Sequence, residues 1–164
     1  MHSRRPRTAA SLRSRRVGYI RRSTLPDGFF HVISRGVNGR GIYADTADRR
    51  RFLGLLSDCE TAYLWTMHAF CLMTTHYHLV VETSREGLSK GLQKLNGRYA
   101  ADFNRRHGRF GHLFAERFTA RVIESEEYLF EACAYVMQNP VRAGLCDRVE
   151  DWPWSYSSYG LESS

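Results

Sequence analysis

Two histidines separated by a single residue, His76 and His78, are the side chains of this chain best suited to hold a metal ion. The apolar residues Leu79, Val80 and Val81 follow at once, which is typical of a β-strand. Successive side chains of a strand point to opposite faces, so both imidazoles leave one face side by side. Neutral imidazole binds divalent cations, and the pair therefore predicts a metal site. An ordinary hydrogen-bonded or surface pair of histidines is the alternative interpretation.

A third metal ligand is needed, because two imidazoles leave a divalent cation under-coordinated. The segment from Tyr135 to Pro140 reads Tyr-Val-Met-Gln-Asn-Pro and lies at the end of a predicted helix. Tyr135 and Asn139 are four residues apart and so share one helical face. The amide oxygen of Asn139 can bind a hard cation, and Gln138 is a substitute ligand. A half-buried packing tyrosine and a plain helix-end asparagine are the alternatives.

The elements that must position these groups follow from hydrophobic periodicity and from turn residues. Strands are predicted over residues 29–35, 64–72, 76–83 and 117–124, and helices over 46–63, 88–106 and 126–139. The order βαββαβ followed by an extra helix predicts an α+β fold of the ferredoxin-like type. This fold is an antiparallel sheet with helices on one face.

Three local features refine this prediction. The tight link from Met73 to Thr75 should make its two strands an antiparallel hairpin. Pro140 should end the last helix, and the aromatic tail at 151–159 should pack over the domain. The apolar stripe that should face the sheet from the last helix consists of Leu129, Cys133 and Val136.

Length and composition limit the class of protein. A chain of 164 residues has room for one domain with its own core. No apolar run approaches the ~20 residues of a membrane span, so no membrane partner is expected. No GxGxxG or P-loop pattern supports a nucleotide cofactor. The four cysteines are far apart without a CxxC pair, which argues against a zinc ribbon and favours a reduced, intracellular protein.

Positive charge is concentrated in the first part of the chain. Residues 1–22 carry eight arginines and no acidic residue, so residues 1–24 are predicted to be a basic, disordered arm before a domain at 25–164. This segment has three interpretations: an arm that binds phosphates, an organelle transit peptide, or a wrongly chosen start codon. Residues 23–123 hold fourteen basic and nine acidic side chains, whereas residues 124–164 hold two and eight. A polyanionic ligand should therefore bind to the arm and to the first two thirds of the domain.

Five short segments together resemble one family, in the family's order, over about residues 29–159. The chain resembles the IS200-like single-tyrosine transposases of the HUH class, and most closely the REP-associated tyrosine transposases. The family commonly has Pro-Asn where this chain has Thr74-Thr75, and an aliphatic residue at Tyr77, whose ring should point away from the metal side. The matching segments are His31-Val-Ile-Ser-Arg-Gly36, Leu72-Met-Thr-Thr-His-Tyr-His-Leu79, Gly111-His-Leu-Phe-Ala-Glu-Arg-Phe118, Tyr135-Val-Met-Gln-Asn-Pro-Val-Arg-Ala-Gly-Leu145 and Trp152-Pro-Trp-Ser155.

The resemblance implies an enzyme whose extra C-terminal helix carries the nucleophile, Tyr135. It implies that His76, His78 and Asn139 bind a divalent cation, Mg²⁺ or Mn²⁺. The implied reaction is metal-dependent cleavage and rejoining of single-stranded DNA at hairpins, through a 5′-phosphotyrosine intermediate. The implied setting is the bacterial cytoplasm, at the nucleoid, and the protein would act as a monomer or a homodimer.

Arginine outnumbers lysine 22 to 2. Its guanidinium binds phosphate and guanine bidentately, which suits a nucleic-acid partner, although a GC-rich genome would produce the same bias. The arginines expected to contact DNA are Arg4, Arg5, Arg7, Arg13, Arg15, Arg16, Arg35, Arg40, Arg98, Arg105, Arg106, Arg117 and Arg121.

Two other functions remain open at this point. The first is a DNA-binding protein of the same fold that binds hairpins without cutting them. The second is a metal-dependent hydrolase of a small molecule. The hydrolase would need a nearby carboxylate as a base. Glu82 lies six residues after His76, ~20 Å along the strand at ~3.3 Å per residue.

Overall fold

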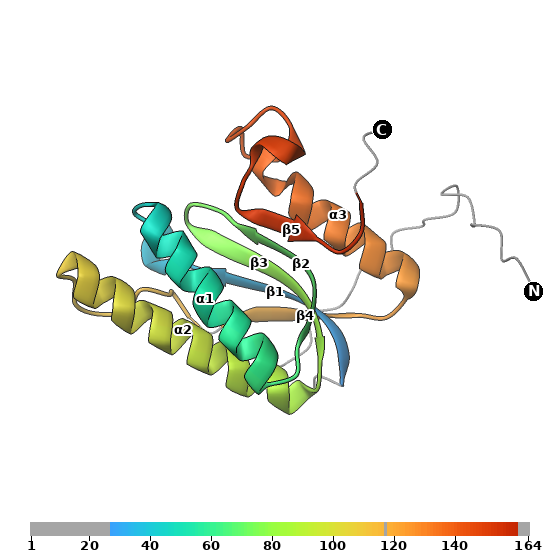
Figure 1. The fold of residues 1–164 in the computed structure, drawn as a ribbon, viewed down its shortest axis with the longest axis horizontal. Coiled ribbons are helices and arrows are strands. Elements are labelled where there is room, and N and C mark those ends of the chain that lie inside the picture. The colour runs from blue at the N-terminus through green and yellow to red at the C-terminus, as the bar shows by residue number, and fades with distance from the viewer. Residues whose placement is uncertain (1–26, 117, 161–164) are drawn as a thin grey trace, which may run out of the picture.

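Five β-strands form one antiparallel sheet in the order β4-β1-β3-β2-β5 (Figure 1). The strands are β1 (Gly28–Arg35), β2 (Thr66–Leu72), β3 (His76–Thr83), β4 (Thr119–Ile123) and β5 (Ser155–Ser157). The first four have the ferredoxin-like order, so the predicted fold class is confirmed.

The coordinates are a computed structural model that describes residues 27–116 and 118–160. The predicted basic arm at residues 1–24 and the side chain of Arg117 lie outside the described residues. No helix within the described part is long and apolar enough to cross a membrane.

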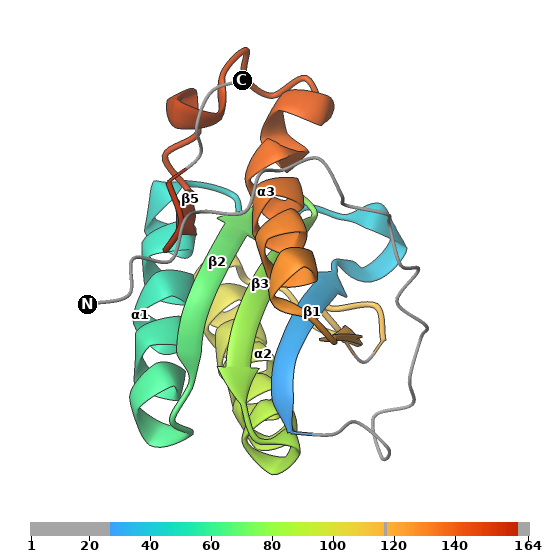
Figure 2. The ribbon, with the colours of Figure 1, turned by 90° about the vertical axis from the view of Figure 1, so that its right-hand side faces the viewer.

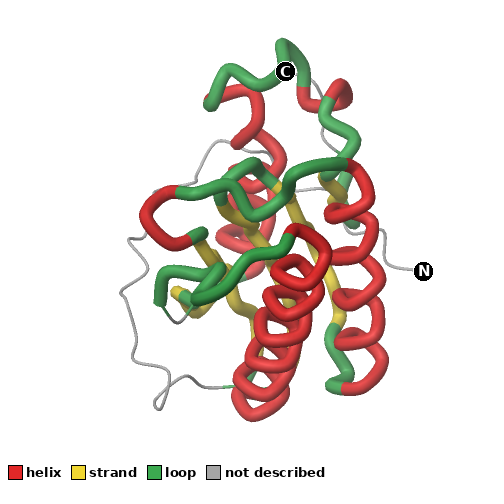
Figure 3. The backbone as a smooth tube through the Cα atoms, turned by 90° about the vertical axis from the view of Figure 1, so that its left-hand side faces the viewer, coloured by secondary structure: helices red, strands yellow, loops and turns green. Residues whose placement is uncertain are grey.

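Helices cover both faces of the sheet. Helices α1 (Thr46–Ala62) and α2 (Arg85–His107) lie against one face, in front of the strands in Figure 3. Helix α3 (Glu126–Arg142) crosses the other face, where it packs mainly on β2 and β3 (Figure 2). The prediction of helices on one face only was therefore incomplete, because the added third helix has its own apolar stripe to bury.

Side-chain caps set where the three helices begin. The side chain of Asp45 accepts a hydrogen bond from the Asp48 amide at 3.0 Å, and Ser84 accepts one from the Gly87 amide at 2.9 Å. Ser125 caps α3 in the same way, at 3.1 Å from the Tyr128 amide. Each cap satisfies an amide at a helix end that has no partner within the helix.

Strand alternation divides the buried side chains between two apolar clusters. Phe30, Val32, Tyr77 and Leu79 belong to the cluster beneath α1 and α2. Two of their strand neighbours, Phe29 and Val80, contribute to the cluster beneath α3, because successive side chains leave opposite faces of the sheet. This second cluster includes the predicted α3 stripe, Leu129, Cys133 and Val136, packed on Ala69, Cys71 and Val80.

Tyr77 therefore faces away from the two histidines beside it, as predicted. Its ring is fully buried against Phe52, and its hydroxyl donates a hydrogen bond to Asn96 Oδ1 at 2.6 Å. Asn96 in turn donates to Ser34 Oγ at 3.2 Å. This network ties the middle of α2 to β1 and β3.

Several boundary predictions were wrong, and α2, for example, begins at Arg85 rather than at residue 88. Helix α3 continues through Pro140 to Arg142, because proline removes only its own amide donor, and the Ala143 amide still reaches the Asn139 carbonyl at 2.9 Å. Strand β2 begins at Thr66 rather than at residue 64. Leu64 has a φ of 55°, which interrupts the extended backbone.

The aromatic tail does more than pack over the domain, since part of it joins the sheet as β5. Strand β5 pairs with the edge of β2, with Ser157 opposite Ala69. The Trp152 indole donates to the Leu72 carbonyl at 3.1 Å, and the Leu72 amide donates to the Trp154 carbonyl at 2.8 Å. These contacts hold the residues that lead into the β2–β3 turn, whose Met73 amide bonds to the His76 carbonyl at 2.9 Å.

Candidate active site

The two central strands bring three histidines onto the face that α3 covers. In the antiparallel register of β1 and β3, Ile33 lies opposite His78 and Arg35 lies opposite His76. His31, two residues before Ile33, projects from the same face. The imidazoles of His76 and His78 lie side by side, with ring centroids 5.0 Å apart, as the strand alternation predicts.

His31 is a site residue to which sequence reasoning assigned no role. Its Nε2 lies 3.0 Å from His78 Nδ1, and both side chains are buried. His31 stands in one of the segments that carry the family resemblance, but only the pairing register of two distant strands places it beside His78. The sequence indicated only that His31 and Arg35 project from the same face of the predicted strand, because they are an even number of residues apart.

Helix α3 brings Tyr135 to this histidine pair. The Tyr135 ring lies edge-on to His31 and His78, with centroids 5.9 Å and 6.0 Å away. The side chain is 42% exposed, so it contacts the histidines while remaining open to a ligand. The apolar stripe of α3 buries one side of the helix, and Tyr135 sits at the border of that stripe, as predicted.

Asn139 lies one turn further along α3. Its Nδ2 donates a hydrogen bond to the Tyr135 carbonyl at 3.0 Å, which leaves the side-chain oxygen, Oδ1, as its free ligand atom. Both residues lie within α3, four positions apart, so they share one helical face as predicted.

Burial keeps the three histidines uncharged. It lowers the pKa of His78 to about 2, assisted by the nearby His31, His76 and Arg35. Burial followed by the charge of Arg35 lowers the pKa of His76 to about 4. Burial and then Arg121, which lies opposite on β4, lower the pKa of His31 to about 4. At neutral pH each ring is therefore neutral and has one nitrogen lone pair.

By chemical type, these side chains suit a divalent cation held by mixed ligands. Neutral imidazoles at His76 and His78 can each offer a lone pair, and Asn139 can offer an amide oxygen. Within residues 27–116 and 118–160, no group of three His, Cys, Asp or Glu side chains is placed to hold a metal ion. The predicted third ligand, Asn139, is of another residue type.

The described arginines expected to contact DNA fall into two groups. Arg35 and Arg121 project from the histidine face, and neither has a carboxylate partner among the described residues. Arg40 is exposed in the loop that follows the short 3₁₀ turn Val37–Gly39. These three remain available for an anionic ligand on the histidine side or at its rim.

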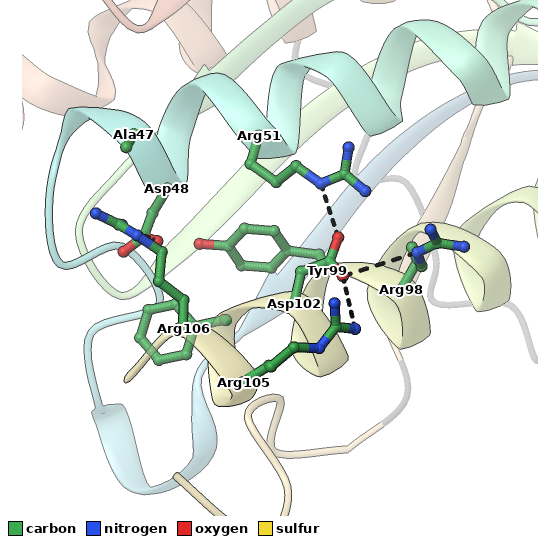
Figure 4. Close-up of a pocket in the computed structure, with 9 residues that line it drawn as sticks. Ala47, Asp48, Arg51, Arg98, Tyr99, Asp102, Arg105 and Arg106 are labelled. Carbon is green, nitrogen blue, oxygen red and sulfur yellow. Dashed lines mark hydrogen bonds and ion pairs between the residues drawn. The ribbon is translucent and has the colours of Figure 1, made fainter. Parts of the chain in front are cut away.

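The second group lies on α2, on the other face of the sheet, and is engaged in ion pairs. Arg98 and Arg105 converge on Asp102, together with Arg51 of α1 (Figure 4). Arg106 contacts Asp45 at 2.6 Å and Asp48 at 2.7 Å. The Arg51–Asp102 and Arg106–Asp48 contacts join α1 to α2, whereas the Arg98 and Arg105 contacts lie within α2. The charges of these arginines are thus balanced by carboxylates on a solvent-exposed side of the helix pair. Their contact with DNA stays a prediction.

Arg142 is a further cation near the candidate nucleophile. Its guanidinium carbon lies 4.8 Å from the centroid of the Tyr135 ring. The residue belongs to the last turn of α3, two turns after Tyr135, where its charge also suits the negative end of the helix dipole. It was not among the expected DNA contacts.

The carboxylate expected for a hydrolase is absent from the described part of the site. Glu82 lies at the far end of β3 and contacts His68 Nε2 at 3.2 Å. The site thus combines neutral imidazoles, one amide and one exposed phenol, and it is bordered by arginines. Such a set can bind a phosphodiester and attack it with the phenol oxygen.

Comparison with known proteins agrees with this description. The family described as "Transposase IS200 like" matches residues 27–139, a span that begins just before β1 and ends at Asn139. The chain belongs to this family, and the predicted family membership is confirmed. No curated protein matches the chain.

A solved structure of similar fold is that of a REP-associated tyrosine transposase bound to a REP hairpin. The two chains are 18% identical and superpose with a TM-score of 0.65, over 88% of this chain and 82% of that one. At this level of identity the similarity concerns the fold, which is the one predicted for the chain.

Proposed function

We propose that this protein is a metal-dependent transesterase of single-stranded, hairpin-bearing DNA, with Tyr135 as its nucleophile. The observation that carries the proposal is the position of Tyr135, whose exposed ring lies edge-on to the buried pair His31 and His78. Membership of the IS200-like transposase family and the fold of a hairpin-bound relative support the same class of substrate.

The reaction is an exchange of one phosphodiester for another. The Tyr135 oxygen attacks the scissile phosphorus and loses its proton to solvent, while the bond from phosphorus to the 3′ oxygen breaks. The leaving 3′ oxygen takes up a proton and becomes a 3′-OH. The phosphate stays attached to tyrosine as a 5′-phosphotyrosine. The reverse attack by a 3′-OH rejoins DNA without ATP, because the new ester keeps the bond energy.

His76, His78 and Asn139 are the residues that would hold Mg²⁺ or Mn²⁺. A cation bound there supplies positive charge that polarises the scissile phosphate. The protein itself orients the phenol, through the packing of α3, and attracts the DNA backbone with Arg35 and Arg121. Neutral imidazoles suit ligation, since protonated rings would repel a cation.

One chain supplies every element of this site. The helix that carries Tyr135 packs on the same chain's β2 and β3, which bears both histidines. This arrangement supports a site that a monomer can complete, and a homodimer stays the alternative. A protein with such a substrate would work on bacterial DNA in the cytoplasm.

The decisive experiment is to trap the covalent adduct. We expect the protein with Mn²⁺ and a hairpin oligonucleotide labelled at its 3′ end to form a labelled adduct that survives denaturing electrophoresis. A 5′ label should instead appear in a free fragment with a 3′-OH. Tyr135→Phe should form no adduct, whereas Tyr156→Phe, which alters a tyrosine of similar exposure in β5, should form it normally.

Two outcomes would contradict the assignment. An undiminished adduct in Tyr135→Phe would mean that another side chain is the nucleophile. Tight binding of hairpins without cleavage, over several metals and several sequences, would favour a DNA-binding protein that does not cut.

A further inference from the structure

The hydrogen bond between His31 and His78 constrains where each ring carries its hydrogen. Their Nε2 and Nδ1 atoms lie 3.0 Å apart, and one hydrogen occupies that bond. One ring must donate and the other must accept. A neutral imidazole has a single N–H, so the direction of this bond decides the state of the remaining nitrogen of His78.

Two arrangements are consistent with neutral rings. If His78 donates from Nδ1, its Nε2 keeps a lone pair that can ligate a cation. If His31 donates from Nε2, the hydrogen of His78 moves to its own Nε2, and no lone pair is left for a ligand. The direction of the His31–His78 bond and the ability of His78 to bind a metal are therefore linked.

Burial prevents water from replacing His31. The exposed fractions of His31 and His78 are 6% and 2%, so a ring nitrogen that lost its partner would stay unsatisfied inside the protein. The strands set the pairing, because His31 and His78 lie on β1 and β3, which are neighbours in the middle of the sheet.

His31 is not placed as a third metal ligand in this site. Its Nε2 already contacts His78 Nδ1, and no group of three His, Cys, Asp or Glu side chains in the described residues is arranged around a common point. Its ring also touches the Tyr135 ring edge-on, at 5.9 Å between centroids. His31 thus contacts both a proposed ligand and the proposed nucleophile.

We propose that His31 is a positioning residue, which accepts the Nδ1 hydrogen of His78 and so keeps His78 Nε2 available to a divalent cation. Histidine ligands of metals commonly donate their second nitrogen to such a partner, which raises affinity and fixes the ring. This proposal rests on the metal-binding role of His78 in the proposed function. It adds that a second imidazole, rather than a carboxylate or a carbonyl, is the partner.

The first test requires no DNA and no metal. Nitrogen-detected NMR of ¹⁵N-histidine-labelled protein distinguishes a ring hydrogen on Nδ1 from one on Nε2. We expect His78 to carry its hydrogen mainly on Nδ1 in the wild type. In His31→Leu, which has no acceptor, the hydrogen should shift towards Nε2, and His31→Gln, whose amide oxygen can accept, should restore the Nδ1 form.

The second test measures Mn²⁺ affinity without DNA, by electron paramagnetic resonance of free Mn²⁺. Loss of such a partner weakens metal binding by about 10- to 100-fold in other sites, so we expect His31→Leu to lose roughly that much and His31→Gln to recover most of it. His68→Leu serves as a matched control, because His68 is a partly buried strand histidine that contacts Tyr159 and Glu82 instead.

Three results would overturn the proposal. They are a wild-type His78 with its hydrogen mainly on Nε2, an unchanged tautomer in His31→Leu, or an Mn²⁺ affinity within twofold of wild type in that variant. If His31→Leu does not fold, the proposal is tested by the position of the His78 ring hydrogen in the wild type and in His31→Gln. Failure of the proposed function looks different, because the tautomer would be as expected while the DNA adduct failed to form.

Discussion

The rings of His78 and Tyr135 lie 6.0 Å apart and nearly perpendicular, although one side chain comes from the central strand β3 and the other from helix α3. The contact exists because the apolar stripe of α3 packs on the same face of the sheet from which His78 projects. A buried imidazole and an exposed phenol from distant parts of the chain are therefore brought together at one place.

The choice of third ligand can be tested by substitutions on α3. Asn139→Ala removes an amide oxygen that would contact the metal directly, so we expect Mn²⁺ affinity to fall by at least the roughly tenfold that loss of a ligand's hydrogen-bond partner costs. Asn139→Asp keeps an oxygen and adds negative charge, and should retain binding. Isothermal titration with Mn²⁺ measures both effects.

Gln138→Ala is the control for this pair, since Gln138 is exposed, adjacent, and the alternative ligand in the sequence. If Gln138→Ala lost affinity while Asn139→Ala kept it, the roles of the two amides would have to be exchanged.

The arginines of the two faces should differ in their effect on DNA binding. Arg35→Ala and Arg121→Ala remove unpaired cations beside the histidines, so each should weaken hairpin binding and reduce the slope of log affinity against log salt by about one. Arg98→Ala and Arg105→Ala remove cations already paired with Asp102, and should change that slope much less.

Fluorescence anisotropy of a labelled hairpin at several salt concentrations gives these slopes. An equal loss for all four variants would place the DNA across both faces of the domain, and would restore the α2 arginines as contacts.

Stability should fall as the pH is lowered from 7 to 5. An unfolded histidine takes up a proton near pH 6.5, whereas burial holds the pKa of His31 at about 4 and that of His78 at about 2. Between these pKa values the unfolded state binds more protons than the folded state. The stability that the two neutral histidines contribute is therefore fully present above pH 6.5 and is lost as the pH falls towards 4. The loss by pH 5 is about 2 kcal/mol for each ring.

Urea denaturation at pH 7, 6 and 5 measures this loss. Replacing His31 with leucine should remove about one ring's share of the pH dependence, whatever its effect on stability at pH 7. A variant with the same pH dependence as the wild type would show that the titration of His31 does not contribute.

Tyr77 should matter for stability and not for chemistry. Tyr77→Phe leaves Asn96 Oδ1 without its hydrogen-bond donor in a buried network, which should lower the free energy of unfolding by about 1–2 kcal/mol. The adduct with DNA should still form at the wild-type rate, because Tyr77 lies on the opposite face of the sheet from Tyr135. Denaturation and the adduct assay give the two results, and a lost adduct in a folded variant would show that Tyr77 takes part in catalysis.

Local spacing alone was enough to predict several parts of this protein. Strand alternation places His76 and His78 on one face and Tyr77 on the other, and helical periodicity places Tyr135 and Asn139 together beside an apolar stripe. The order of the elements predicts the ferredoxin-like sheet. These features depend on residues close in the chain or on a pattern repeated along one element, which a sequence contains explicitly.

The tertiary structure decided what depends on pairing between distant segments. The register of β1 against β3 places His31 beside His78. Among the described residues, the arginines of α2 have carboxylate partners, whereas Arg35 and Arg121 on the other face have none. The tail pairs with the edge of β2 as β5. No local pattern contains this information, because a register is set by the packing of whole faces, and a shift of one residue would turn every side chain of a strand to the other face.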